Sequence, residues 1–177
     1  DITFQFLSML AEYANATGDT QFLRDHWSNI ESSYRYCSSL IDPADGLPRV
    51  PAGKEGSDEQ GHPREELSLA VAWVQASEAF AHLADLTGHN DLGQQAQTAG
   101  LRASTTIPAH FWNGRRKFWS SGILENGQPE EAMHLPPVAS LPLLSVPQQN
   151  EVLNRIASRE FQTAWGTRGV GSASKNF

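Results

Sequence analysis

Hydrophobic residues follow two different helical patterns along this chain. Residues 3–17 and 66–87 carry apolar side chains around most of the helical circumference, which is typical of helices buried on nearly all sides. Residues 20–41 and 91–111 instead place apolar side chains at steps of three and four, with polar residues between them. The sequence therefore predicts that buried helices and helices with one apolar face alternate along the chain.

This alternation favours an all-α fold in which an outer ring of helices covers an inner ring. A partial repeat supports the pairing, because Thr17-Gly18-Asp19 and Thr87-Gly88-His89 each join an apolar helix to one with a single apolar face. The two turns lie 70 residues apart (87 − 17), which does not suit the roughly 34-residue period of tetratricopeptide arrays. We therefore interpret the fold as an α/α toroid, in which long loops on one rim would carry the chemistry.

Shorter elements are predicted after the long connector. Pro63 fits the first turn of the helix that follows, and the two glutamates after it suit the positive end of the helix dipole. Residues 114–121 resemble a short strand or hairpin, residues 136–145 a short helix, and residues 147–161 an amphipathic helix opened by a proline. The second half of the chain is therefore expected to contain shorter and more varied elements than the first.

The composition is that of a globular protein, and it excludes several classes of function. The chain has 177 residues, 39% hydrophobic and 19% charged, which is material for one domain at 1–177 with a sizeable core. A net charge of −7, with the basic residues scattered, argues against a nucleic-acid partner. No run of about 18 apolar residues occurs, so we expect no membrane-spanning segment. Cys37 is the only cysteine, which excludes a disulfide within the chain.

The connector GKEGSDEQG, at residues 53–61, places three carboxylates among three glycines. Clustered carboxylates such as Glu55, Asp58 and Glu59 can act as general acids and bases, because crowding separates their pKa values. The glycines would let a ligand approach the main chain closely. A solvated acidic loop explains the same residues, and calcium is a third alternative, although the spacing matches no EF-hand loop.

Aromatic residues and histidines offer fewer signals. Trp119 and Trp165 fall in predicted loops or strands, where stacking on a sugar and packing are both open, whereas Trp73 and Trp112 are expected to be core residues. The histidines form no H-E-x-x-H motif, so we expect no metal. A G-x-S-x-G elbow and a glycine-rich phosphate loop are also absent from the sequence, and we expect no cofactor.

Four stretches occur in an order and at spacings that match a known family. They are DITFQFLSMLAEYANATGDTQFLRDHW, HPREELSLAVAWVQASEAFAHLA, FWNGRRKFW and FQTAWGTRGVGS, and together they span most of the chain. They resemble the C-terminal, amylo-α-1,6-glucosidase-type domain of glycogen debranching enzymes and its relatives among the six-hairpin glycosidases. The resemblance implies part of an (α/α)6 barrel, about three helical hairpins with a small β-hairpin. It also implies a carbohydrate substrate, with an α-glucosidic bond of a glucan or oligosaccharide hydrolysed with inversion.

The resemblance assigns the general acid to the loop that corresponds to GKEGSDEQG. The family's W-M-D signature is absent, and Asp58 stands nearest to its aspartate, so the acid role passes to Asp58. Glu59 and Glu55 remain candidates for the same role. The family's second carboxylate, the base, follows a Y-H-x-G-T-V-W stretch, which we expect beyond Phe177.

Glu66, Arg64 and Trp119 are the sugar contacts that the resemblance suggests. Half of a barrel is expected to be inactive alone and to self-associate through its exposed inner helices. We expect a cytoplasmic location. Two alternatives stay open. A sugar epimerase or lyase on the same toroid is disfavoured by the scarcity of rim histidines, and a helical-hairpin interaction module is disfavoured by the long connector from Asp42 to Arg64.

Overall fold

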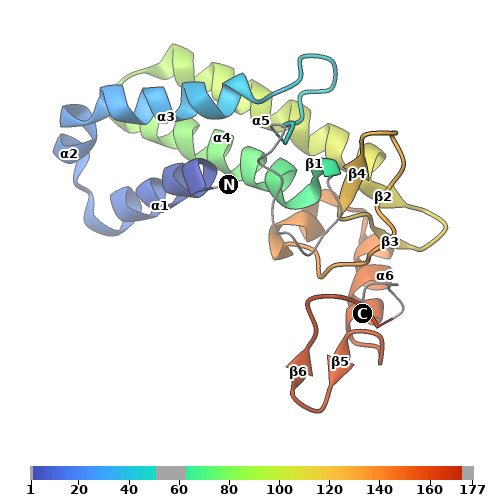
Figure 1. Ribbon diagram of the computed structural model, residues 1–177. Helices are drawn as coiled ribbons and strands as arrows, with labels where there is room; N and C mark the ends of the chain where they lie inside the picture. The colour runs from blue at the N-terminus through green and yellow to red at the C-terminus, as the bar shows by residue number, and fades with distance from the viewer. Residues whose placement is uncertain (1, 51–62, 173–177) are drawn as a thin grey trace. The chain divides into compact units, whose positions relative to one another are not determined.

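The computed structural model describes residues 2–50 and 63–172, and most of them are helical (Figure 1). The mainly helical class predicted from the sequence is therefore confirmed, with three two-stranded β pairs added among the described residues. None of the helices in this part of the chain is long and apolar enough to cross a membrane. The acidic connector lies outside the described residues.

The chain divides into two compact units by its internal contacts. The first unit joins Asp1–Pro48 to Ala72–Thr106, and the second joins Arg49–Val71 to Ile107–Phe177. Within each unit the sequence pattern accounts for most helices, but several boundaries differ from the predictions. The toroid and the single domain at 1–177 stay predictions.

All the named elements of the first unit are helices, and one isolated β-bridge joins Ile41 to Pro48. The predicted helix at 20–41 is divided at His26, which ends one helix and precedes the next. Asp19 caps the first of the two, because its Oδ1 accepts a hydrogen bond from the backbone N–H of Phe22 at 3.0 Å. The helices are α1 (Ile2–Thr17), α2 (Thr20–Asp25), α3 (Trp27–Ser39), and the parts of α4 (Leu67–Thr87) and α5 (Asn90–Phe111) that belong to this unit.

Aromatic rings form the centre of the first unit. Trp73 is fully buried, meets the ring of Phe4 edge-on with centroids 6.1 Å apart, and stacks with Tyr34 at 5.4 Å. Tyr34 in turn stacks on Phe80 at 4.0 Å. Rings in these arrangements contribute about 0.5–1.5 kcal/mol per pair beyond the area they bury. The prediction that Trp73 is a core residue is confirmed.

The burial of α4 and α1 differs, although the sequence predicts both to be buried on nearly all sides. Buried side chains cover most of α4, as expected. On α1 only Phe4, Leu7 and two alanines are buried, whereas Phe6 and Met9 are exposed. The prediction for α1 is therefore wrong, because within the described residues of its unit this helix is covered on one side only.

In the second unit the residues from Pro63 form a strand, not the predicted first turn of a helix. Strand β1 (Pro63–Glu66) pairs antiparallel with β4 (Gly122–Leu124), placing Glu65 opposite Ile123 and Glu66 opposite Gly122. Helix α4 starts at Leu67, directly after this strand and one residue later than the predicted helix at 66–87. The distant strand β4 forms hydrogen bonds with the backbone of these residues, so they do not depend on hydrogen bonds within a helix. The two predicted helical glutamates thus become neighbours on a strand.

The remaining elements of the second unit follow the predictions more closely. The short strand or hairpin expected at 114–121 is observed as a hairpin that starts two residues earlier, with strands at 112–113 and 118–119. The helix opened by Pro147 begins with a capping box between Ser145 and Gln148. The elements are β2 (Trp112–Asn113), β3 (Phe118–Trp119), the 3-10 helix η1 (Val138–Leu143), α6 (Val146–Ile156), β5 (Gln162–Thr163) and β6 (Gly166–Thr167).

Candidate functional site

Strand β1 directs its two glutamates to different surroundings. Successive side chains of a strand point to opposite faces, and burial alternates along Pro63–Glu66 accordingly. Glu65 is completely buried, whereas Glu66 is partly exposed. The strand therefore holds one glutamate inside the unit and presents the next at its surface.

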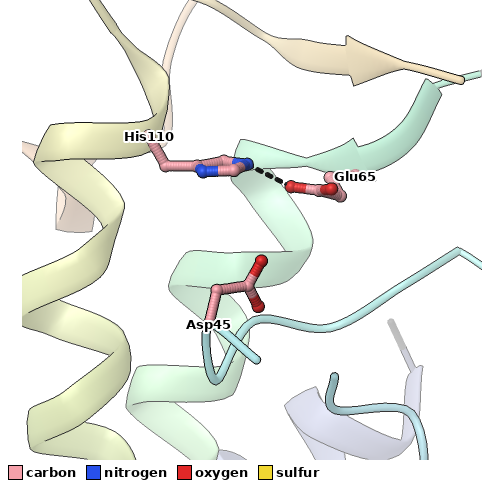
Figure 2. A group of neighbouring side chains, drawn as sticks. All are labelled: Asp45, Glu65 and His110. Atoms are coloured by element: carbon pink, nitrogen blue, oxygen red, sulfur yellow. Dashed lines mark hydrogen bonds and ion pairs between the residues drawn. The ribbon is translucent and has the colours of Figure 1, made fainter. Parts of the chain in front are cut away.

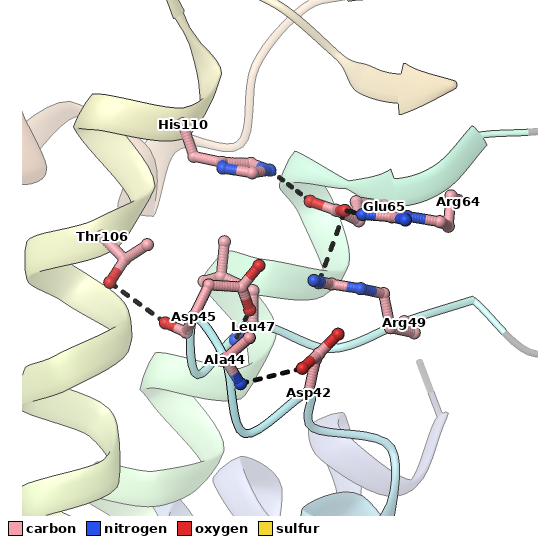
Figure 3. Close-up of polar contacts among 9 residues, drawn as sticks. All are labelled: Asp42, Ala44, Asp45, Leu47, Arg49, Arg64, Glu65, Thr106 and His110. Carbon is pink, nitrogen blue, oxygen red and sulfur yellow. Dashed lines mark hydrogen bonds and ion pairs between the residues drawn. The ribbon is translucent and has the colours of Figure 1, made fainter. Parts of the chain in front are cut away.

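Arg49, Arg64 and His110 lie around Glu65 (Figure 3), and Figure 2 shows its contact with His110. Its Oε1 accepts hydrogen bonds from Nε and Nη2 of Arg64 at 3.1 and 2.6 Å, and Nη1 of Arg49 lies 3.5 Å away. Its Oε2 contacts Nε2 of His110 at the end of α5. A buried carboxylate is tolerated only when it is paired and hydrogen-bonded in this way. We interpret the cluster as structural, because it fixes strand β1 and hence the position of Glu66.

A cleft of about 300 Å³ opens beside the other glutamate. Backbone hydrogen bonds frame it, from Leu67 N to Ser121 O at 2.9 Å and from Leu135 N to Gly169 O at 2.7 Å. Its lining combines apolar surface with a few polar groups, as is typical of ligand sites. The lining residues are Pro63, Glu66, Leu67, Ser68, Trp119, Ser121, Glu130, His134, Leu135, Pro136, Pro137 and Gly169.

Glu130 is the second carboxyl group of this cleft, and a turn after β4 brings it there. Gly127 adopts a positive φ of 76°, and the chain returns so that the backbone N–H of Glu130 donates to the carbonyl of Gly122 at 2.9 Å. A Cβ added at Gly122 would lie 2.7 Å from Cβ of Pro63 and 3.4 Å from Oε2 of Glu130. Only glycine therefore lets strand β1 and Glu130 approach β4 so closely.

Burial governs the protonation of the titratable groups in the cleft. It raises the pKa of Glu130, which is 7% exposed, and the negative charge of Glu66 raises it further. Burial lowers the pKa of His134, whose Nε2 lies 3.8 Å from Oε1 of Glu130. That distance is longer than a hydrogen bond. Desolvation therefore favours a neutral carboxyl beside a neutral imidazole over an ion pair.

Trp119 forms part of the cleft wall. It is 1% exposed and meets Trp112 edge-on, with ring centroids 6.0 Å apart. Its indole Nε1 is buried and has no hydrogen-bond partner among the described residues. A buried indole N–H usually finds an acceptor, so this donor needs an acceptor from outside the described side chains.

The structure brings together two of the residues that the sequence suggested as sugar contacts. Glu66 and Trp119 both line the cleft. Arg64 binds Glu65 and does not line it. Asp58 and Glu59, the suggested catalytic residues, lie outside the described residues, as does Glu55. Their roles stay predictions.

Sequence reasoning missed Glu130 and His134. They lie in the stretch PEEAMHLPP, which has no helical or strand period to direct attention to it. The available signals were weak: an i, i+4 spacing of the two residues, and a nearby Asn126-Gly127 pair that predicts a turn. Trp165 is 97% exposed, and Trp112 lies in a strand at intermediate burial, so Trp112 is not the full core residue that we expected.

Comparison with known proteins identifies the fold but no family. No family model matches the chain, and no curated protein sequence matches it. Among solved structures, the GH78 family rhamnosidase of Bacillus sp. GL1 is similar over 88% of this chain, at 16% identity and a TM-score of 0.73. A sialidase is similar over 90% of this chain, at 13% identity and a TM-score of 0.75. The chain spans 17% and 15% of the length of those two proteins. It therefore shares the fold of a segment found in glycosidases.

Proposed function

We propose that this chain is part of a glycoside hydrolase and that it binds a sugar in the cleft beside Glu66. The observation that supports this most strongly is the convergence of Glu66, Glu130 and Trp119 on one cleft. Carboxyl groups bind sugar hydroxyls, and Trp119 contributes apolar surface to the wall of the cleft. The fold shared with a rhamnosidase and a sialidase is consistent with this chemistry.

The finer proposal follows the resemblance to the debranching-type domain. It comprises part of an α/α toroid, an α-glucosidic substrate and inversion at the reacting carbon. In that mechanism two carboxyl groups stand roughly 6.5–9.5 Å apart, one protonating the leaving oxygen and the other activating water. Asp58 would be the acid, with Glu59 as the alternative, and the base would come from outside this chain. Self-association through apolar helix faces belongs to the same proposal.

Sugar binding to the 177-residue chain tests the proposal. Glucose, maltose and rhamnose are titrated, and binding is followed through the indole N–H resonance of Trp119. We expect Glu66→Gln to weaken binding about 10- to 100-fold, because a hydrogen bond to a charged group contributes about 1.5–3 kcal/mol. Glu125→Gln is the matched control, since Glu125 is exposed directly after strand β4 and is not among the described residues that line the cleft. The proposal fails if none of these sugars binds, or if the two variants behave alike.

A further inference from the structure

The surroundings of Glu130 disfavour its ionised form. The titratable side chains that line the cleft with it are Glu66 and His134. No lysine or arginine is among the described residues of this lining. An ionised Glu130 would thus be a nearly buried charge that faces a second carboxylate and an imidazole 3.8 Å away, with no lysine or arginine among the described lining residues to compensate it. Burial of an uncompensated charge is costly enough that such groups take up a proton.

The surroundings of Glu130 differ from those of Glu65, which is also buried. Glu65 is hydrogen-bonded by Arg64 and has Arg49 nearby, so its charge is matched. Two buried glutamates of one unit therefore have opposite electrostatic surroundings. Arginines lie beside the carboxylate of Glu65, whereas burial raises the pKa of Glu130.

We propose that Glu130 acts in the cleft as an uncharged carboxylic acid that donates a hydrogen bond to a ligand oxygen. This inference deepens the proposed function by assigning Glu130 as a specificity-determining residue of the same site. Trp119, whose buried indole N–H has no partner among the described residues, also lines the cleft, and Glu66 is an acceptor there. This combination matches sugar hydroxyl groups, which both donate and accept.

The same arrangement disfavours a sugar that carries its own carboxylate. A carboxylate in the cleft would face the negative charge of Glu66 and would find no lysine or arginine among the described lining residues. The cleft therefore selects a neutral sugar over the corresponding uronate.

Two measurements test the role of Glu130 in the intact chain. The first follows the carboxyl carbon of Glu130 by NMR as the pH is raised. We expect its pKa to lie above the ordinary glutamate value of 4.5, and a pKa at or below that value would overturn the inference. The second compares glucose with glucuronate, which differ only at C6. We expect glucose to bind at least 10-fold more tightly, and its affinity to fall as the pH rises through the pKa of Glu130, because the proton that Glu130 donates is then lost.

Glu130→Gln separates a neutral donor from a charged group. Its amide keeps the size of the side chain and still donates, so we expect glucose affinity within about 3-fold of the parent chain and no loss as the pH rises. A loss of 10-fold or more at low pH, or affinity that increases with pH, would overturn the inference. These outcomes are distinct from failure of the proposed function, which shows as no sugar binding at any pH. The titration of Glu130 decides its protonation even if Glu130→Gln does not fold.

Discussion

The buried ion cluster around Glu65 allows a quantitative prediction about stability. Glu65→Gln keeps the shape of the side chain but removes the charge that faces Arg49 and Arg64. The carboxylate is 0% exposed, whereas the side chains of Arg49 and Arg64 are 20% and 42% exposed. The substitution therefore removes the buried member of the cluster and leaves arginines that water can partly reach.

The magnitude follows from the contacts that are lost. Removing one partner of a buried ion pair costs about 3–5 kcal/mol, and the partial exposure of the arginines favours the lower end, about 3 kcal/mol. For a protein of this length, 1 kcal/mol shifts the Tm by about 2–4 °C, so we expect a fall of about 6–12 °C.

Glu31→Gln is the matched control, because it makes the same chemical change on the surface. Glu31 pairs with Arg35 one helical turn away at 2.5 Å, and Arg35 is 74% exposed. Such pairs contribute about 0.3–0.5 kcal/mol, so the Tm should fall by only about 1–2 °C. Thermal unfolding followed by tryptophan fluorescence measures both. Equal shifts in the two variants would refute the reasoning that burial, rather than pairing itself, makes Glu65 important.

Two further predictions concern close packing. Gly122→Ala should lower the free energy of unfolding by about 1–3 kcal/mol and weaken sugar binding, since its Cβ would lie 2.7 Å from Cβ of Pro63. Gly114→Ala is the control and should be almost neutral, because the nearest atom to its Cβ lies at 4.0 Å. Equal changes in the two variants in chemical denaturation would contradict this reasoning. Burial raises the pKa of Cys37 from 9.0 to about 11, which lowers the thiolate fraction at pH 8 about 100-fold. The folded chain should therefore react with a thiol reagent at least that much more slowly than the denatured chain, and comparable rates would show that the site is open.

Local periodicity predicted the elements whose neighbours are helices. The helix at 91–111 matches α5 closely, and Pro147 lies at the start of α6 as expected. The strand Pro63–Glu66 was not predicted, because its helical appearance is local and its partner strand is distant in sequence. The burial of α1 was overestimated for a related reason. A helix with apolar residues all round shows that its faces could be covered, but the pattern does not show that the same unit covers them.

The candidate site was predictable from the sequence only for the residues that the family resemblance covers. Glu66 and Trp119 were selected because a family resemblance covers both of them, and both line the cleft. Glu130 carries no such signal. Its role depends on a return of the chain after β4 and on its proximity to Gly122, which are features of the folded backbone. The charge of a buried carboxyl depends on its neighbours, and those neighbours are known only from the fold.

The alternation along strand β1 has a consequence for how strictly the pairing with β4 is aligned. A shift of one residue in one direction would place Arg64 where Glu65 now meets Arg49 and His110, bringing like charges together. A shift in the other direction would still put a glutamate in the cluster, but it would move Leu67 into the place of Glu66 at the cleft. Each misalignment thus either brings like charges together or replaces the carboxylate at the cleft by an apolar side chain. The side chains of Pro63–Glu66 therefore favour a single register of pairing with β4. Insertions or deletions in this segment should be tolerated far less than single substitutions at its exposed positions.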